Sequence, residues 1–200
     1  MHKSATIILC ILYVHAYSQK TVGMEQYYYW QQKSSSTVVP KLFYQSPKKW
    51  YTEFRYNYEE IQTGSIHFGK QFGFKKIPQL KVTPSAGYLF GKLNGVSTGT
   101  IIAFETDKFC FSSEPLYVFS FKDKYENYLY SWTELTYQVN SFFYAGLALQ
   151  QTKAYEDQNV FEPGIMAGFS IKNFEIPIYC FNPYSGTKNF VLGVNWRWEK

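Results

Sequence analysis

The sequence has few of the side chains on which metal centres and nucleophilic enzymes depend. It contains three cysteines and three histidines in 200 residues, and two of the histidines, His2 and His15, lie close to the N-terminus. His67 is the only other histidine, which excludes a histidine-cluster metal site and argues against zinc. Cys110 and Cys180 stand alone in different predicted strands, which argues against a disulfide framework. We expect no cofactor and no bound metal.

Long apolar runs are also scarce. The mean hydropathy is −0.30, and the apolar stretch over residues 5–13 is too short to span a bilayer as a helix. Lys3 precedes this stretch, and Ala16 and Ser18 supply small residues at the −3 and −1 positions of a cleavage site before Gln19. We therefore predict a cleaved signal peptide over residues 1–18 and export of the mature chain.

The net charge of +5 is mild, and the lysines fall at predicted strand ends and turns without forming a cluster. Such a distribution does not favour binding of nucleic acid, which requires a basic patch or stripe. Lysines in turns can instead lie beside lipid phosphates. We expect no nucleic-acid partner.

Aromatic residues are abundant, and they alternate with polar residues. They make up 21% of the chain, with 19 tyrosines and 18 phenylalanines. In residues 190–198, Phe190, Leu192, Val194, Trp196 and Trp198 share one side, whereas Val191, Gly193, Asn195 and Arg197 share the other. Because side chains alternate between the two faces of a strand, this segment predicts a strand with one apolar and one polar face.

The same pattern recurs from about residue 48 to the C-terminus and predicts ten antiparallel strands. We place them at about 48–60, 63–74, 79–92, 97–107, 109–121, 127–139, 142–153, 161–172, 174–182 and 189–199. The connections alternate between tight turns and longer loops, which is typical of an up-and-down transmembrane β-barrel. An even strand number brings both ends of the barrel to the short-turn side, which is the periplasm.

Residues 19–47 differ from this pattern, because Pro40 argues against a central strand. We interpret them as a periplasmic lead-in to a barrel formed by residues 48–200. The aromatic cluster of residues 27–30 is expected to anchor this segment at the membrane interface.

The polar face indicates which side of the barrel is the inside. Nine of the 13 glycines share that face: Gly69, Gly73, Gly87, Gly91, Gly99, Gly146, Gly164, Gly168 and Gly193. Small residues and pairs of opposite charges suit a narrow lumen. A soluble barrel of the lipocalin type would instead bury the apolar face. We favour the membrane barrel, with these residues lining its lumen: Glu53, Arg55, Asn57, Lys81, Glu105, Glu114, Glu134, Glu162, Glu175 and Arg197.

The chain resembles small outer-membrane β-barrel proteins of the Bacteroidetes type. The resemblance covers most of residues 48–200 and depends on the signal ending Ala-Tyr-Ser-Gln, the stretches 50–59 and 63–70, and the aromatic C-terminal strand. It implies a location in the outer membrane of a Gram-negative bacterium, with lipid around the barrel and recognition of the last strand by the barrel-assembly machinery. It implies no activity, and therefore no catalytic residue.

Three functions fit this prediction. The first is a structural or binding protein whose lumen is closed by an arginine–glutamate network. The second is a narrow, acid-lined channel for cations or small solutes. The third is a hydrolase of lipid or peptide at the outer rim. If the hairpin turns about Gln62, Ser65 lies opposite Glu59, and Ser65, His67 and Glu59 share the inner face.

Overall fold

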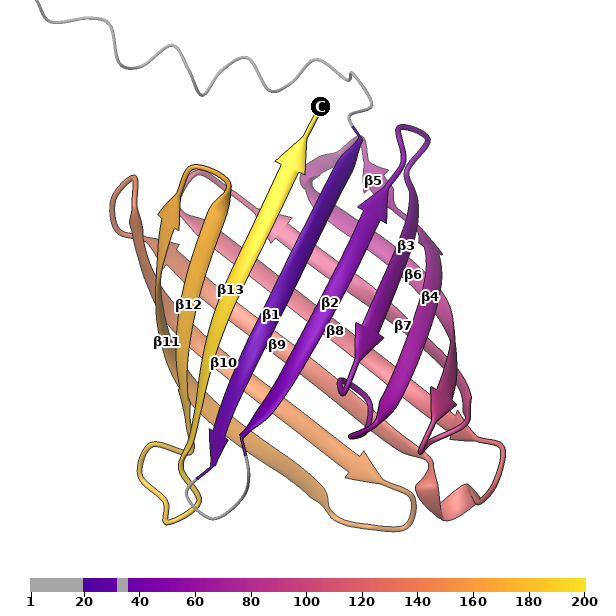
Figure 1. Cartoon of the computed structure of the whole chain (residues 1–200). Helices are drawn as coiled ribbons and strands as arrows, with labels where there is room; N and C mark the ends of the chain where they lie inside the picture. The colour runs from indigo at the N-terminus through magenta and orange to yellow at the C-terminus, as the bar shows by residue number, and fades with distance from the viewer. Residues whose placement is uncertain (1–19, 32–35) are drawn as a thin grey trace, which may run out of the picture.

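A computed structural model describes residues 20–31 and 36–200 as a closed antiparallel β-barrel (Figure 1). Its strands are β1 (Thr21–Gln31), β2 (Thr37–Gln45), β3 (Trp50–Tyr56), β4 (Thr63–Lys70), β5 (Phe72–Phe74), β6 (Ile77–Gly91), β7 (Gly95–Glu105), β8 (Phe109–Ser120), β9 (Tyr128–Gln138), β10 (Phe143–Ala154), β11 (Asn159–Ile171), β12 (Phe174–Phe181) and β13 (Asn189–Glu199). Segments β4 and β5 both pair with β6 and are separated only by Gln71, so the barrel has twelve strands. The predicted signal peptide lies outside the described residues.

The barrel closes between the first and last strands. β1 pairs with β13 over eleven residue pairs, from Thr21 opposite Glu199 to Gln31 opposite Asn189. All other pairs join strands that are consecutive in sequence, with β4 pairing to β6. Closure pairs every long strand on both sides and leaves only the short β5 with a single neighbour, β6. A sheet without long free edges can enter a bilayer.

The predicted number of ten strands is wrong, and so is the lead-in over residues 19–47. Described residues of that segment form β1 and β2, so the last strand pairs with β1 and not with the strand at residue 50. Pro40 is accommodated because β2 pairs with β3 only from Lys41 onward, so its missing N–H falls beyond that ladder. The alternation was hidden because apolar Val39 and Phe43 point into the lumen with Lys41.

The apolar face is on the outside, as predicted. The outward side chains of Trp50, Phe68 and Leu147 are 56, 62 and 60% exposed, whereas Glu53 and His67 inside the barrel are 1 and 2% exposed. This arrangement excludes the soluble barrel, in which the apolar face is buried. An apolar band on the outer surface of a barrel with a polar lumen suits a bilayer.

The connections differ in length at the two ends of the barrel (Figure 1). At the end that carries both described termini they cover residues 46–49, 75–76, 106–108, 139–142 and 172–173. At the opposite end they include 57–62, 92–94, 121–127, 155–158 and 182–188, with a short 3-10 helix, η2 (Lys124–Glu126), in one of them. We name these the terminal end and the loop end.

The described residues contain no helix with the length and apolarity needed to cross a membrane.

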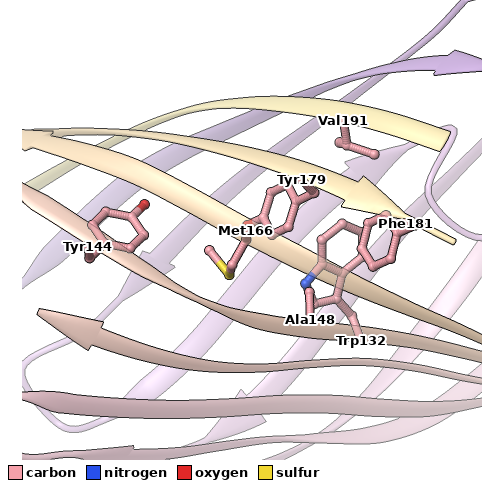
Figure 2. Close-up of a cluster of buried hydrophobic side chains, with 7 residues drawn as sticks. All are labelled: Trp132, Tyr144, Ala148, Met166, Tyr179, Phe181 and Val191. Carbon is pink, nitrogen blue, oxygen red and sulfur yellow. The ribbon is translucent and has the colours of Figure 1, made fainter. Parts of the chain in front are cut away.

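Two apolar clusters fill part of the lumen. The larger contains Trp132, Tyr144, Ala148, Met166, Tyr179, Phe181 and Val191 (Figure 2). The smaller contains Leu89, Leu93, Leu116 and Val118. The lumen therefore contains both apolar clusters and buried polar side chains.

Candidate functional site

A diagonal row of inward side chains crosses the wall from the terminal end toward the loop end. Each member lies opposite the next on the neighbouring strand, which brings their Cβ atoms to about 5 Å. The row comprises Glu175, Asn195, Glu25, Lys41, Arg55, Ser65 and Leu89. It places two basic residues at its centre, with two glutamates toward the terminal end and Ser65 and Leu89 toward the loop end.

Lys41 occupies the centre of a carboxylate cage. Its Nζ atom lies 3.3 Å from Glu25, 3.3 Å from Glu53 and 3.2 Å from Glu114, and the residue is 3% exposed. Glu114 reaches it from β8, on the far side of the barrel, whereas Glu25 and Glu53 come from neighbouring strands. Lys41 therefore ties opposite walls together through the lumen.

Arg55 forms a second link across the lumen. Its Nε atom bonds Glu53, its Nη1 atom lies 3.6 Å from Glu59, and its Nη2 atom lies 3.7 Å from Glu114. The guanidinium also stacks 4.2 Å from the ring centroid of Tyr58. We call Glu25, Lys41, Glu53, Arg55, Glu59 and Glu114 the charged belt. Loss of one member leaves a buried partner uncompensated, so the belt is costly to break from one side.

The loop between β3 and β4 folds into the barrel mouth and delivers Glu59 to the belt. Strand β3 ends at Tyr56, and Ser65 lies opposite Arg55 and His67 opposite Glu53. The predicted pairing of Ser65 with Glu59 is therefore wrong. The hairpin has a six-residue loop, in which Asn57 adopts a positive φ of 58° and its side chain accepts from the backbone N–H of Gln62.

The structure nevertheless gathers Ser65, His67 and Glu59, which are 0, 2 and 9% exposed. The Ser65 hydroxyl donates to Glu59 at 2.8–2.9 Å, and Nε2 of His67 lies 3.1 Å from the same carboxylate. In the serine–histidine arrangement the serine hydroxyl donates to the imidazole, whereas here the Ser65 hydroxyl donates to the Glu59 carboxylate. The arrangement fixes the loop in the mouth.

Burial alone would raise the pKa of Glu59, yet the hydrogen bond from His67 and the charge of Arg55 hold that pKa below its ordinary value. A carboxylate that receives hydrogen bonds and faces a cation is stabilised in its charged form. Glu59 therefore keeps its charge inside the mouth. Its backbone carbonyl also accepts a hydrogen bond from the hydroxyl of Tyr128, which fastens the loop to β9.

Cavities open below the belt, toward the terminal end. One has a volume of about 290 Å³ and a second of about 390 Å³, and Lys41, Glu105, Glu114 and Arg197 line both. A third, of about 380 Å³, reaches Lys172 and Asn173 in a terminal-end turn and shares Glu25 and Arg197 with the others. We call this connected space the vestibule.

The structure places most of the predicted lumen residues in the belt or the vestibule. Glu53, Arg55 and Glu114 belong to the belt, and Lys81, Glu105, Glu134, Glu175 and Arg197 line the vestibule. Lys81 pairs with Glu105 at 3.2 Å, and both are about half exposed to lumen solvent. Two residues lie elsewhere. Asn57 caps the β3–β4 loop, and Glu162 accepts from Asn182 at 3.0 Å near the loop end.

Sequence reasoning missed two central residues, Glu25 and Lys41, because both lie in the segment taken as a lead-in. The alternation that indicates a strand was present, because Thr21, Gly23 and Glu25 alternate with apolar Val22 and Met24. Inward Tyr27 and Tyr29 interrupt the alternation, because they pack against the larger apolar cluster. Aromatic side chains on both faces therefore made β1 resemble an interfacial anchor.

Neither cysteine forms a disulfide, and they belong to different faces of the wall. Cys110 pairs with inward Glu105, whereas Cys180 lies between inward Tyr179 and Phe181 and so points outward. Across residues 20–31 and 36–200, no three or more His, Cys, Asp or Glu side chains are grouped to hold a metal ion.

Solved structures similar to this barrel include those of two porins. The KdgM porin matches with a TM-score of 0.63 at 11% identity, covering 87% of this chain and 98% of that chain, and one of its structures is a complex with disordered oligogalacturonate. The NanC porin matches with a TM-score of 0.63 at 12% identity, covering 88% of this chain and 99% of that chain. No protein-family model and no curated protein matches the sequence. The likeness shows a fold shared with outer-membrane porins.

Proposed function

We propose that the protein is a narrow outer-membrane channel for small solutes that favours cations over anions. The observation that carries this proposal is the charge of the side chains that line the 290 Å³ cavity of the vestibule. Five glutamates line the 290 Å³ cavity, namely Glu25, Glu105, Glu114, Glu134 and Glu175, against two basic residues, Lys41 and Arg197. Acidic side chains around a constricted pore attract cations and repel anions.

The porin fold supports the proposal of a channel, and the residues that line the cavity indicate which class of solute it would pass. KdgM has been solved with oligogalacturonate, a chain of acidic sugars. An excess of glutamates opposes passage of such a polyanion, so we propose a different class of solute for this protein.

The proposed channel has an open side and a closed side. The vestibule leads from the terminal end, which we assign to the periplasm because its turns are short. The charged belt and the β3–β4 loop obstruct the side toward the loop end, which we assign to the cell surface. Lipid around the barrel and the barrel-assembly machinery acting on β13 are its proposed partners.

The test is the reversal potential of refolded protein in planar bilayers under a KCl gradient. We expect a permeability ratio of K⁺ to Cl⁻ above one. The double substitution Glu105→Gln and Glu175→Gln should move that ratio toward one. The control is Glu156→Gln, which changes an exposed carboxylate in the β10–β11 loop. A ratio at or below one in the wild type contradicts the proposal.

A further inference from the structure

The vestibule has an aromatic wall in addition to its carboxylates. Tyr27, Trp132, Tyr144 and Tyr179 line the same 290 Å³ cavity. The ring centroids of Tyr27 and Trp132 are 5.7 Å apart, and those of Trp132 and Tyr179 are 5.1 Å apart. Figure 2 shows Trp132 and Tyr179 side by side, with Tyr144 further along the cluster. The rings come from β1, β9, β10 and β12, so the wall depends on closure of the barrel.

One carboxylate is fixed against this wall and keeps an open acceptor atom. The Oε1 atom of Glu134 accepts from the hydroxyl of Tyr179 at 2.8 Å and from the indole N–H of Trp132. Among the described residues, its Oε2 atom receives no hydrogen bond, and no basic side chain pairs with Glu134 within 4.0 Å. The two neutral donors orient the carboxylate without neutralising it.

The other vestibule carboxylates differ in how they are compensated. Glu25 and Glu114 share Lys41, and Glu105 pairs with Lys81. Glu175 takes part in no ion pair among the described residues. The uncompensated negative charge therefore lies with Glu134, beside the aromatic wall, and with Glu175 toward the terminal end.

We propose that this cavity binds a small organic ammonium ion, with its charge facing Glu134 and its carbon groups against Trp132 and the tyrosines. The proposal rests on the cation-preferring channel and names its solute class. Aromatic rings attract cations through the negative potential of their faces, most strongly for tryptophan. An inorganic cation would gain little from an apolar wall, and an anion would be repelled by the glutamates. The cavity volume limits the ligand to a small molecule.

The 290 Å³ cavity can be reached from the terminal end and lies on the proposed route of the solute. The cavity shares Glu25 and Arg197 with the cavity that reaches the terminal end, and Lys41 and Glu114 of the charged belt also line it. An ammonium ion entering from the terminal end would meet Glu175 before it reaches Glu134. At Glu134 it would lie beside the charged belt, because Trp132 is the neighbour of Glu114 across the β8–β9 pair.

The experiment compares choline with 3,3-dimethylbutan-1-ol, its uncharged isostere. The full mature chain is refolded in detergent micelles with ¹⁵N-labelled tryptophan, and Trp132→Phe identifies the indole N–H signal of Trp132. We expect choline to shift that signal saturably and the alcohol to bind at least tenfold more weakly. Equal binding of the two, or no saturable shift with choline, overturns the inference, and both titrations use the wild-type chain, since Trp132→Phe serves only to assign the signal.

A second measurement tests the carboxylate. Glu134→Gln should raise the dissociation constant of choline at least tenfold, whereas Glu156→Gln should leave it unchanged. Gel mobility without boiling shows whether each variant has folded, and an unchanged affinity in folded Glu134→Gln overturns the assigned role. Binding in micelles does not require conduction. A protein that binds choline but prefers Cl⁻ refutes only the channel proposal, and a cation-selective protein that ignores choline refutes only the site.

Discussion

Arg55 illustrates what a single side chain contributes to the lumen. It contacts carboxylates from its own strand, from the β3–β4 loop and from β8 across the barrel. These contacts satisfy a guanidinium that is only 5% exposed. They also hold the loop and the far wall in a fixed relation, so the effect of its removal should extend beyond the pairs themselves.

We predict that Arg55→Ala lowers the free energy of unfolding by about 3–5 kcal/mol, because it orphans buried carboxylates. Urea unfolding of the protein refolded in lipid vesicles measures this loss. The matched control is Lys92→Ala, which removes a rim lysine lying 3.2 Å from Glu60 in an exposed pair. An exposed pair contributes only about 0–1 kcal/mol. Equal losses in the two variants would show that the belt is not buried.

Glu59 should make the stability depend on pH. Its pKa is lower in the folded protein than in the unfolded chain, so its contribution is complete above its ordinary pKa and is lost as the pH falls through the lowered value. The destabilisation caused by Glu59→Gln should therefore shrink between pH 6 and pH 3. Urea midpoints at several pH values measure it, with Glu60→Gln as the exposed control. A pH-independent difference would mean that Glu59 is uncharged in the mouth.

Residue orientation was predictable, but residue partnership was not. Strand parity alone placed Glu53, Arg55 and Arg197 inside and Trp50 and Phe68 outside. The partners of Arg55 depend on the hairpin register and on side chains that cross the lumen from β8. The register depends in turn on a six-residue loop whose shape is set by Asn57 and by contacts with distant Tyr128. The alternation of apolar and polar residues carries no information on the hairpin register or on contacts across the lumen.

At the scale of the element, the side chains of β13 point alternately toward the lipid and into the lumen. Leu192 lies opposite outward Tyr28 and Ile178, whereas Asn195 lies between inward Glu25 and Glu175. Val191, although inward, is fully buried within the larger apolar cluster, so the lumen wall is not uniformly polar.

We predict that Leu192→Arg impairs folding into lipid far more than Asn195→Arg. An arginine on the lipid face near mid-membrane costs about 2–4 kcal/mol, whereas an arginine at position 195 gains two neighbouring carboxylates. The fraction that shows folded gel mobility in vesicles gives the comparison. If Asn195→Arg is the more damaging change, the assignment of the two faces is inverted.

The first two strands offer a direct test of the strand number. β1 supplies the pairing partner of β13, and β2 supplies Lys41 to the belt. A chain that starts at residue 46 should therefore fail to refold into a compact, heat-modifiable barrel. The full mature chain is the control. Folding of the shortened chain would show that ten strands close by themselves.

At the scale of the whole molecule, the class of fold could be predicted and its dimensions could not. Alternating residues and an apolar C-terminal strand indicate a membrane barrel without any knowledge of contacts. The number of strands was missed because β1 and β2 carry aromatic residues that point inward, which removes the polar face that identifies a strand. The vestibule was missed for a related reason, since its lining residues come from strands far apart in the sequence, from β1 to β13.

The whole barrel has a lumen that is filled in part by two apolar clusters, opens as a vestibule toward the terminal end and is crossed by the charged belt. The most direct test of this arrangement is single-channel recording of wild type and Arg55→Ala in planar bilayers, with Lys92→Ala as the control. We predict small cation-preferring currents for the wild type and the control, and larger currents of the same preference for Arg55→Ala, because the belt loosens. A steady large current in the wild type that Arg55→Ala leaves unchanged would contradict closure by the belt.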